Sequence, residues 1–228
     1  MLPRAIDSIL KQSGPWEIIL INDDPADLET NKLLVSYARK STFTRNIVIA
    51  PPREHRGFSK AVNHGIALAT GDVGIVLADD DALCPDWLYA VDHWFTKKPD
   101  LVALWADYFI TYDWKNFNSV EAPGADFAML KEKQVIPGGG TAVRMNVLKR
   151  EGLDETLAHN EDWDLMLRVL RHGRGMSVPG YHCMIVHSHP HSKSVVNLPA
   201  VAETSALIKR RIAEGRYEHA ADCWCKRT

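Results

Sequence analysis

The chain has 228 residues, of which 46% are hydrophobic and 25% are charged, and these proportions are typical of a globular protein. Its formal net charge of -2 provides no basic field, so nucleic acid is not expected as a partner. No apolar run approaches the roughly 20 residues that a transmembrane helix needs, and the first twelve residues do not resemble a signal peptide. Four scattered cysteines do not form a disulfide framework, so a cytoplasmic location is expected.

The first hundred residues alternate between amphipathic segments and short apolar runs. Apolar residues recur at helical spacing in residues 1–12, 26–39 and 58–69, and again after Pro85. Apolar runs too short for helices lie at residues 16–21, 47–50 and 73–78. This alternation predicts an α/β fold with a mostly parallel sheet and helices on both faces.

The pattern is less regular after residue 100. We expect a strand at residues 101–110, a loop or weak hairpin at 113–133, and a glycine-rich bend at 136–141. Further helices are predicted at 147–151, 161–172 and 201–211, and strands at 176–179 and 184–187. No internal repeat or linker divides the chain, so one domain is expected.

Three adjacent aspartates, Asp79, Asp80 and Asp81, follow the apolar run at 73–78. Adjacent carboxylates repel one another, and their oxygen atoms suit Mg²⁺ or Mn²⁺. The carboxyl end of a strand in an open α/β sheet is also where ligands bind. A metal site is one interpretation; a solvated acidic turn that caps the next helix is the other.

Other polar residues are expected near the same edge of the sheet. Asp23 ends the first apolar strand, and Arg53, Arg56 and Lys60 lie in or just after a loop on that side. These cations could form a solvated loop. Beside the aspartates, they favour a metal-bound diphosphate, which needs carboxylates for the metal and cations for the remaining charge.

Two motifs of the second half have both a structural and a functional interpretation. Gly138, Gly139 and Gly140 are followed by neither Lys-Ser nor Lys-Thr, so they do not form a P-loop. They form either a plain turn or a close backbone approach to a ligand. Glu161 and Asp162 begin a helix, where they either complement its dipole or provide a general base.

Four histidines lie between residues 182 and 191. His187 ends an apolar strand, which is a good position for a neutral imidazole that binds a metal ion. His189 is the next candidate, and His191 is expected in solvent.

In their order along the chain, these motifs resemble those of the family 2 glycosyltransferases of the GT-A fold, which transfer a sugar from a nucleotide-sugar donor. The matching segments are Glu17–Asp23, Arg56–Ile66, Leu77–Asp81, Gly139–Gly140 and Glu161–Arg168. The family normally begins with another strand, which the first residues of this sequence do not contain, and Ala78 stands where an aspartate is common.

The resemblance implies a role for each motif. Asp23 would contact the nucleotide base, Asp79 the ribose and Asp80 the divalent ion, with Asp81 nearby, while Gly139 and Gly140 would belong to an acceptor-side loop. Asp162 would be the catalytic base, with Glu161 as the alternative. Arg56 and Lys60 would neutralise phosphate charge, and His187 would assist Asp80 and Asp81 at the metal.

The implied activity is a metal-dependent, inverting sugar transfer with Mn²⁺ or Mg²⁺. The donor would be UDP-, GDP- or dTDP-linked, and the acceptor a saccharide or another hydroxyl compound. Residues 1–100 would form the nucleotide-binding half of the domain, residues 101–190 the acceptor-binding half, and residues 191–228 a helical tail. A non-catalytic nucleotide-sugar-binding protein and a nucleotidyltransferase are the alternatives.

Acceptor choice is expected to depend on residues 107–134 and the tail. An aromatic set could stack on a sugar ring, although core packing is expected to account for at least half of its members: Trp105, Tyr108, Tyr112, Trp114 and Phe117.

Overall fold

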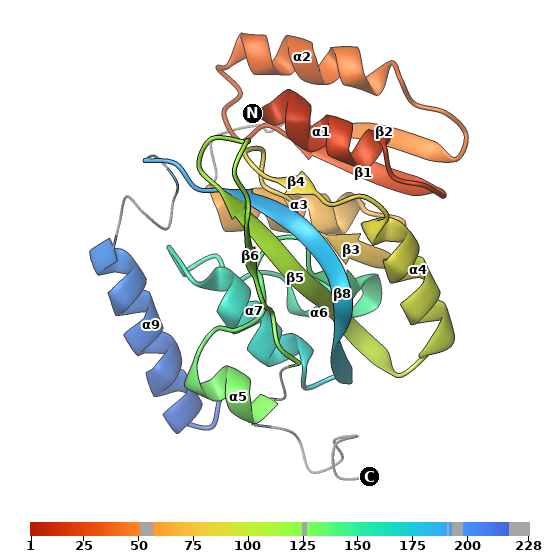
Figure 1. Cartoon of the computed structure of the whole chain (residues 1–228). Coiled ribbons are helices and arrows are strands. Elements are labelled where there is room, and N and C mark those ends of the chain that lie inside the picture. Colours follow the sequence, from red (N-terminus) through yellow and green to blue (C-terminus); the bar gives the residue numbers. More distant parts are fainter. Residues whose placement is uncertain (51–56, 125–126, 191, 193–197, 219–228) are drawn as a thin grey trace.

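The computed structural model describes residues 1–50, 57–124, 127–190, 192 and 198–218 (Figure 1). Its first part comprises helices α1 (Leu2–Leu10) and α2 (Leu28–Ala38) and strands β1 (Trp16–Ile21) and β2 (Arg45–Ala50). The two strands pair in parallel, from Trp16 opposite Arg45 to Ile21 opposite Ala50. The inward faces of both helices and both strands share one hydrophobic cluster, which includes Ile6, Ile18 and Leu34.

The second sheet has six strands in the order β3-β7-β5-β8-β4, with β6 paired to β5. The strands are β3 (Val73–Ile75), β4 (Ala82–Leu83), β5 (Leu101–Thr111), β6 (Asn118–Val120), β7 (Ala142–Arg144) and β8 (Arg174–His187). Among the described pairings of this sheet, β5 with β8 is parallel and the others are antiparallel.

The α/β class is therefore confirmed, but the sheet is mixed rather than mostly parallel. Strand direction depends on how the connections run, and an apolar run does not encode this. The tripeptide β7 leads directly into helix α6 (Met145–Glu151), and β4 and β6 are too short to show a periodic pattern.

Helices pack on both faces of the six-stranded sheet, as predicted. Helix α4 (Trp87–Lys97) covers one face, where it meets Leu104 of β5. Five described helices contribute to the core on the other face, where Trp105 of β5 points. They are α3 (Phe58–Leu68), α5 (Phe127–Glu132), α6, α7 (Glu161–Val169) and α9 (Leu198–Ala213). Leu104 and Trp105 are both completely buried, so consecutive residues of β5 pack into the cores on opposite faces of the sheet.

Several elements differ from their predicted bounds. Strand β3 ends after three residues, and β8 is one strand of 14 residues where two were expected. The segment predicted as a loop or weak hairpin contains β6 and helix α5, and the last described helix is α9 (Leu198–Ala213). None of the described helices combines the length and apolar character needed to cross a membrane.

Candidate active site

The acidic run, which comprises Asp79, Asp80 and Asp81, lies against the end of strand β8. Strand β4 pairs antiparallel with β8, with Ala82 opposite Ile185, so the preceding aspartates reach the residues that follow Ile185. The main-chain N–H of His187 donates to Asp81 Oδ1 at 3.0 Å. The ring Nε2 of His189 lies 3.0 Å from Asp80 Oδ2. The structure thus brings these two predicted metal-site aspartates and both histidines together.

The three aspartates have different surroundings. Asp79 is exposed, whereas Asp80 and Asp81 are partly buried. Together, its surroundings raise the pKa of Asp81 to about 7: burial is the largest cause, the charges of Asp80 and Asp79 also raise the pKa, and the His187 N–H lowers it. A carboxylate in this position is stabilised by added positive charge.

His187 meets the aspartates through its backbone rather than its ring. Its ring packs against Trp114, with centroids 5.0 Å apart, and against His189 at 5.2 Å. Its ring Nδ1 is buried and has no hydrogen-bond partner among the described residues. Of the two histidines considered from the sequence, His189 is the one whose ring reaches a carboxylate oxygen.

The donor atoms fit a divalent ion whose remaining coordination positions would be filled by a substrate and water. Among the described residues, no group of three or more His, Cys, Asp or Glu side chains is arranged to hold a metal by itself. Asp80 and His189 supply one oxygen and one nitrogen within 3.0 Å of each other. Mg²⁺ sites commonly use one or two carboxylates together with waters and substrate phosphates, and Mn²⁺ accepts similar ligands.

The glycine bend connects the acidic run to helix α7. The N–H of Gly140 donates to the carbonyl of Val76, three residues before Asp79, at 3.1 Å. At the other end of the bend, a Cβ on Gly138 would lie 2.2 Å from Asp162 Oδ2. Trp87 of α4 donates its indole N–H to the Gly140 carbonyl at 2.8 Å and anchors the bend from the opposite face. The bend therefore lies between the two predicted acidic centres.

Asp162 is held close to this bend at the start of α7. Its Oδ2 accepts from Gln134 Nε2 at 3.2 Å, and its Oδ1 accepts from the Trp163 N–H at 2.8 Å. Burial raises the pKa of Asp162, and the neighbouring Glu161 raises it further. A carboxylate with a raised pKa can accept a proton near neutral pH. Gln134 was not predicted, because a neutral residue in an aperiodic stretch carries no signal.

Asp23 lies at the start of helix α3. Its Oδ2 accepts from the N–H of Gly57 at 2.8 Å, and Lys60 is exposed on the first turn of the same helix. Arg53, Arg56 and His191 fall outside the described residues.

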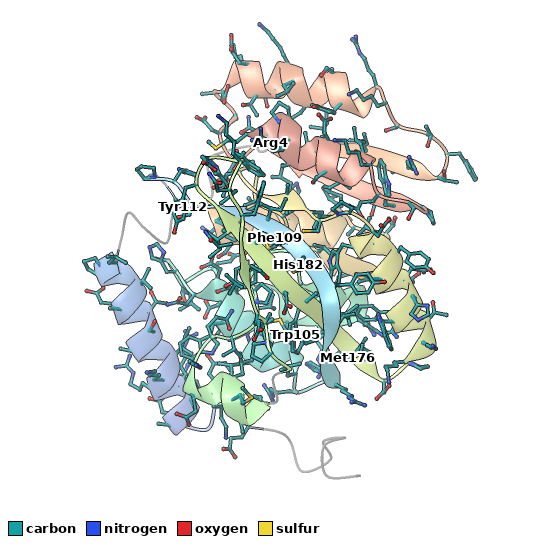
Figure 2. The ribbon with its side chains drawn as sticks, viewed as in Figure 1. Arg4, Trp105, Phe109, Tyr112, Met176 and His182 are labelled. Atoms are coloured by element: carbon teal, nitrogen blue, oxygen red, sulfur yellow. The ribbon has the colours of Figure 1, made fainter. Side chains whose placement is uncertain are left out.

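The aromatic residues considered for acceptor binding divide between core and surface. Trp105 belongs to the core, where its indole N–H donates to the Pro123 carbonyl at 3.1 Å. Tyr112 is 68% exposed and Phe117 is 45% exposed. Phe109 of β5 stacks on His182 of β8 with ring centroids 3.9 Å apart (Figure 2).

Comparison with known proteins decides the family. Residues 1–157 match the model of the family described as Glycosyl transferase family 2. The chain belongs to this family. Among curated proteins, the probable glycosyltransferase YdaM of Bacillus subtilis is 26% identical over 181 residues, which are 75% of this chain and 43% of YdaM. The uncharacterised protein y4gI of Sinorhizobium fredii is 32% identical over 109 residues, 47% of this chain and 12% of y4gI.

Solved structures of glycosyltransferases share the fold of this family 2 chain. S. aureus TarS 1–349 in complex with UDP-GlcNAc has a TM-score of 0.75 at 13% identity, covering 97% of this chain and 64% of TarS 1–349. The mannosyltransferase PcManGT from Pyrobaculum calidifontis, in complex with GDP-Man and Mn²⁺, has a TM-score of 0.61 at 13% identity, covering 96% and 72%. The predicted GT-A fold is confirmed by these matches. The chain spans less than half the length of both curated relatives.

Proposed function

We propose that this family 2 chain binds a nucleotide-sugar donor and a divalent ion, and transfers the sugar to an acceptor hydroxyl with inversion at the anomeric carbon. The observation that carries the proposal is the glycine bend, which contacts Val76, just before the acidic run, through Gly140 and the partly buried Asp162 through Gly138. A carboxylate site for the metal and a separate carboxylate with a raised pKa thereby lie on two sides of one backbone segment.

The donor side of the proposed site is built around Asp80. Asp80 and His189 would hold the ion, and Asp81, whose Oδ1 is occupied by the His187 N–H, would add negative charge behind it. When bound, the ion supplies positive charge to the diphosphate leaving group. We assign Asp79 to the ribose and Asp23 to the base, and place Lys60 near the phosphates. TarS and PcManGT bind UDP-GlcNAc and GDP-Man, so UDP and GDP are the first nucleotides to test.

The acceptor side is built around Asp162. Its carboxylate takes the proton from the acceptor hydroxyl as that oxygen attacks the anomeric carbon. The bond between this carbon and the diphosphate oxygen breaks on the opposite face, and the electron pair leaves with the diphosphate. Gly139 and Gly140 let the bend pack closely on Met184, because an added Cβ would lie 2.7 Å from a Met184 side-chain atom at Gly139 and 3.0 Å at Gly140. Glu161 is 7% exposed and raises the pKa of Asp162, which suits a supporting role better than that of the base.

A thermal-shift comparison tests the donor side. UDP, GDP and dTDP are each added to the wild type with Mn²⁺ and again with EDTA. We expect one nucleotide to raise the melting temperature with Mn²⁺ and not with EDTA, because a ligand at about 100 times its Kd stabilises by about 2.7 kcal/mol.

Two histidine variants make the same test specific to the metal site. Mn²⁺ binding is followed by the signal of free Mn²⁺. His189→Ala should weaken this binding by about 10-fold or more, and His187→Ala should weaken it less. Equal stabilisation with Mn²⁺ and with EDTA, or a larger effect of His187→Ala, would contradict the assignment. Nucleotide binding without sugar transfer to any acceptor would favour a non-catalytic binding protein.

A further inference from the structure

Asp164, on the first turn of α7, is a buried carboxylate with donors from two helices. Only 2% of this residue is exposed. Arg168, one turn later on the same helix, donates to its Oδ2 at 2.8 Å. Arg211 of α9 donates to its Oδ1 at 3.1 Å, and the hydroxyl of Tyr217 donates to the same oxygen. Arg211 also pairs with Asp154 at 2.8 Å.

Asn160, the residue that precedes α7, also forms hydrogen bonds with α9. Asn160 has a left-handed backbone, with φ of 54°. Its side-chain amide donates to the Val201 carbonyl and to Ser205 Oγ, both at 3.0 Å. Helix α9 therefore holds the beginning of α7 at two points, Asn160 and Asp164, and Asp162 lies between them.

The geometry of the first turn connects these contacts to the proposed base. Residues two positions apart in a helix point about 200° apart around its axis. Asp164 therefore faces α9 while Asp162 faces the glycine bend, where a Cβ on Gly138 would lie 2.2 Å from Asp162 Oδ2. A small rotation of this turn would move the Asp162 carboxylate away from Gly138 and Gln134.

Charge balance alone does not account for the contacts from α9. Arg168 already gives Asp164 a salt bridge within the same helix at 2.8 Å. Arg211 and Tyr217 add two more donors from sequence positions 47 and 53 residues away. Arg168 shares its charge with Glu151 at 3.3 Å, so Arg211 also adds charge to Asp164, but the contacts from α9 and Tyr217 additionally fix the orientation of the turn.

We propose that Arg211 and Tyr217 are positioning residues for sugar transfer: they hold Asp164 so that Asp162 stays against the glycine bend. This inference rests on the proposed function, because it takes Asp162 as the base. It assigns to the C-terminal segment Leu198–Tyr217 a role in catalysis that acts through α7, without contact with the reacting atoms.

The test compares Arg211→Met, Arg211→Lys and Tyr217→Phe with the wild type, in the full chain. Arg216→Gln is the matched control, because the Arg216 side chain is 61% exposed and pairs with Glu214 on the surface. We expect Arg211→Met to lower kcat about 10- to 100-fold, since a displacement of about 1 Å can cost 10²-fold. Arg211→Lys should recover part of the loss, and Tyr217→Phe should lower kcat by a smaller factor. The KM for the donor and the Kd for the nucleotide diphosphate should stay within about twofold in all of them.

A second measurement does not depend on turnover. In Arg211→Met, amide hydrogen exchange at residues 160–164 should accelerate at least about 10-fold, while exchange in β5 stays unchanged. Unchanged kcat with unchanged exchange at 160–164 would overturn the inference. A parallel loss of kcat and nucleotide affinity, with faster exchange throughout the sheet, would also overturn it by showing a general structural role. An inactive wild type would contradict the proposed function instead, and the exchange data would still decide whether α9 holds this turn.

Discussion

At the scale of single residues, Gly138 has no room for a side chain. An added Cβ would lie 2.2 Å from Asp162 Oδ2 and 2.9 Å from its Cγ. Gly138→Ala should therefore displace the Asp162 carboxylate and lower kcat by about 10-fold or more. Gly124→Ala is the control, because a Cβ there meets nothing within 4 Å. Steady-state transfer rates of both variants check this prediction, and equal rates would show that Asp162 does not need its present position.

The protonation of Asp162 predicts the direction of a pH effect. Burial and then Glu161 raise its pKa above the ordinary value of 3.8. A base acts only when deprotonated, so kcat/KM should fall as pH decreases through this raised pKa. The acidic limb of the profile should thus lie above the ordinary carboxyl range. Profiles of kcat/KM for the free enzyme would test this, and a flat profile down to pH 4 would contradict a base with a raised pKa.

Single residues also show which contacts of the site could not be predicted from the sequence. The sequence placed His187 ahead of His189 as the candidate metal ligand, whereas the ring of His189 is the one that reaches Asp80. Strand β8 ends at His187, whose N–H bonds to Asp81, and His189 lies beyond the strand, where its ring can turn toward Asp80. The strand end at His187 was predicted, but the direction in which each histidine ring turns depends on tertiary contacts, such as the packing of the His187 ring on Trp114, which the local pattern does not contain. Gln134 left no signal at all, although it contacts Asp162.

At the scale of elements, the spacing of apolar residues predicted the longer helices and strands, which depend on local sequence. Helices α1, α2, α3, α4 and α7 lie close to where apolar residues recur at helical spacing. Strand β1 has the predicted bounds. Strands β4, β6 and β7 and helix α5 were missed, because two to six residues do not establish a period and the strands pair with distant segments.

Gln12, just after helix α1, forms hydrogen bonds with the segment that follows the acidic run. Gln12, with 2% exposure, donates to the Cys84 carbonyl at 2.9 Å and accepts from the Leu88 N–H at 3.1 Å. Gln12→Ala would remove the acceptor of the Leu88 N–H and leave the Cys84 carbonyl with the longer bond from the Trp87 N–H at 3.4 Å, so it should lower the free energy of unfolding by about 1–3 kcal/mol. Lys11→Ala, at the exposed neighbouring position, should change it by less than about 0.5 kcal/mol. Denaturant unfolding of both variants would decide, and similar midpoints would show that the Gln12 contacts contribute little.

At the scale of the whole molecule, side chains link the two sheets near the site. Glu17 of β1 accepts from Thr70 before β3, at 2.8 Å from the N–H and 3.0 Å from the hydroxyl. Asp23, just after β1, accepts from Gly57 at the start of α3. The α/β class could be predicted because alternation of helix and strand is a property of the chain. The mixed strand directions could not, because they depend on the connections between distant elements.

The central claim is that a donor bound through the acidic run is attacked by a hydroxyl that Asp162 deprotonates. The most direct test is nucleotide release during turnover by the wild type and by Asp162→Asn, with Mn²⁺ and the donor that carries the stabilising nucleotide. The account predicts that Asp162→Asn lowers kcat by about 10²- to 10⁴-fold and leaves the Kd of the nucleotide diphosphate unchanged. Turnover by Asp162→Asn at the wild-type rate would contradict it.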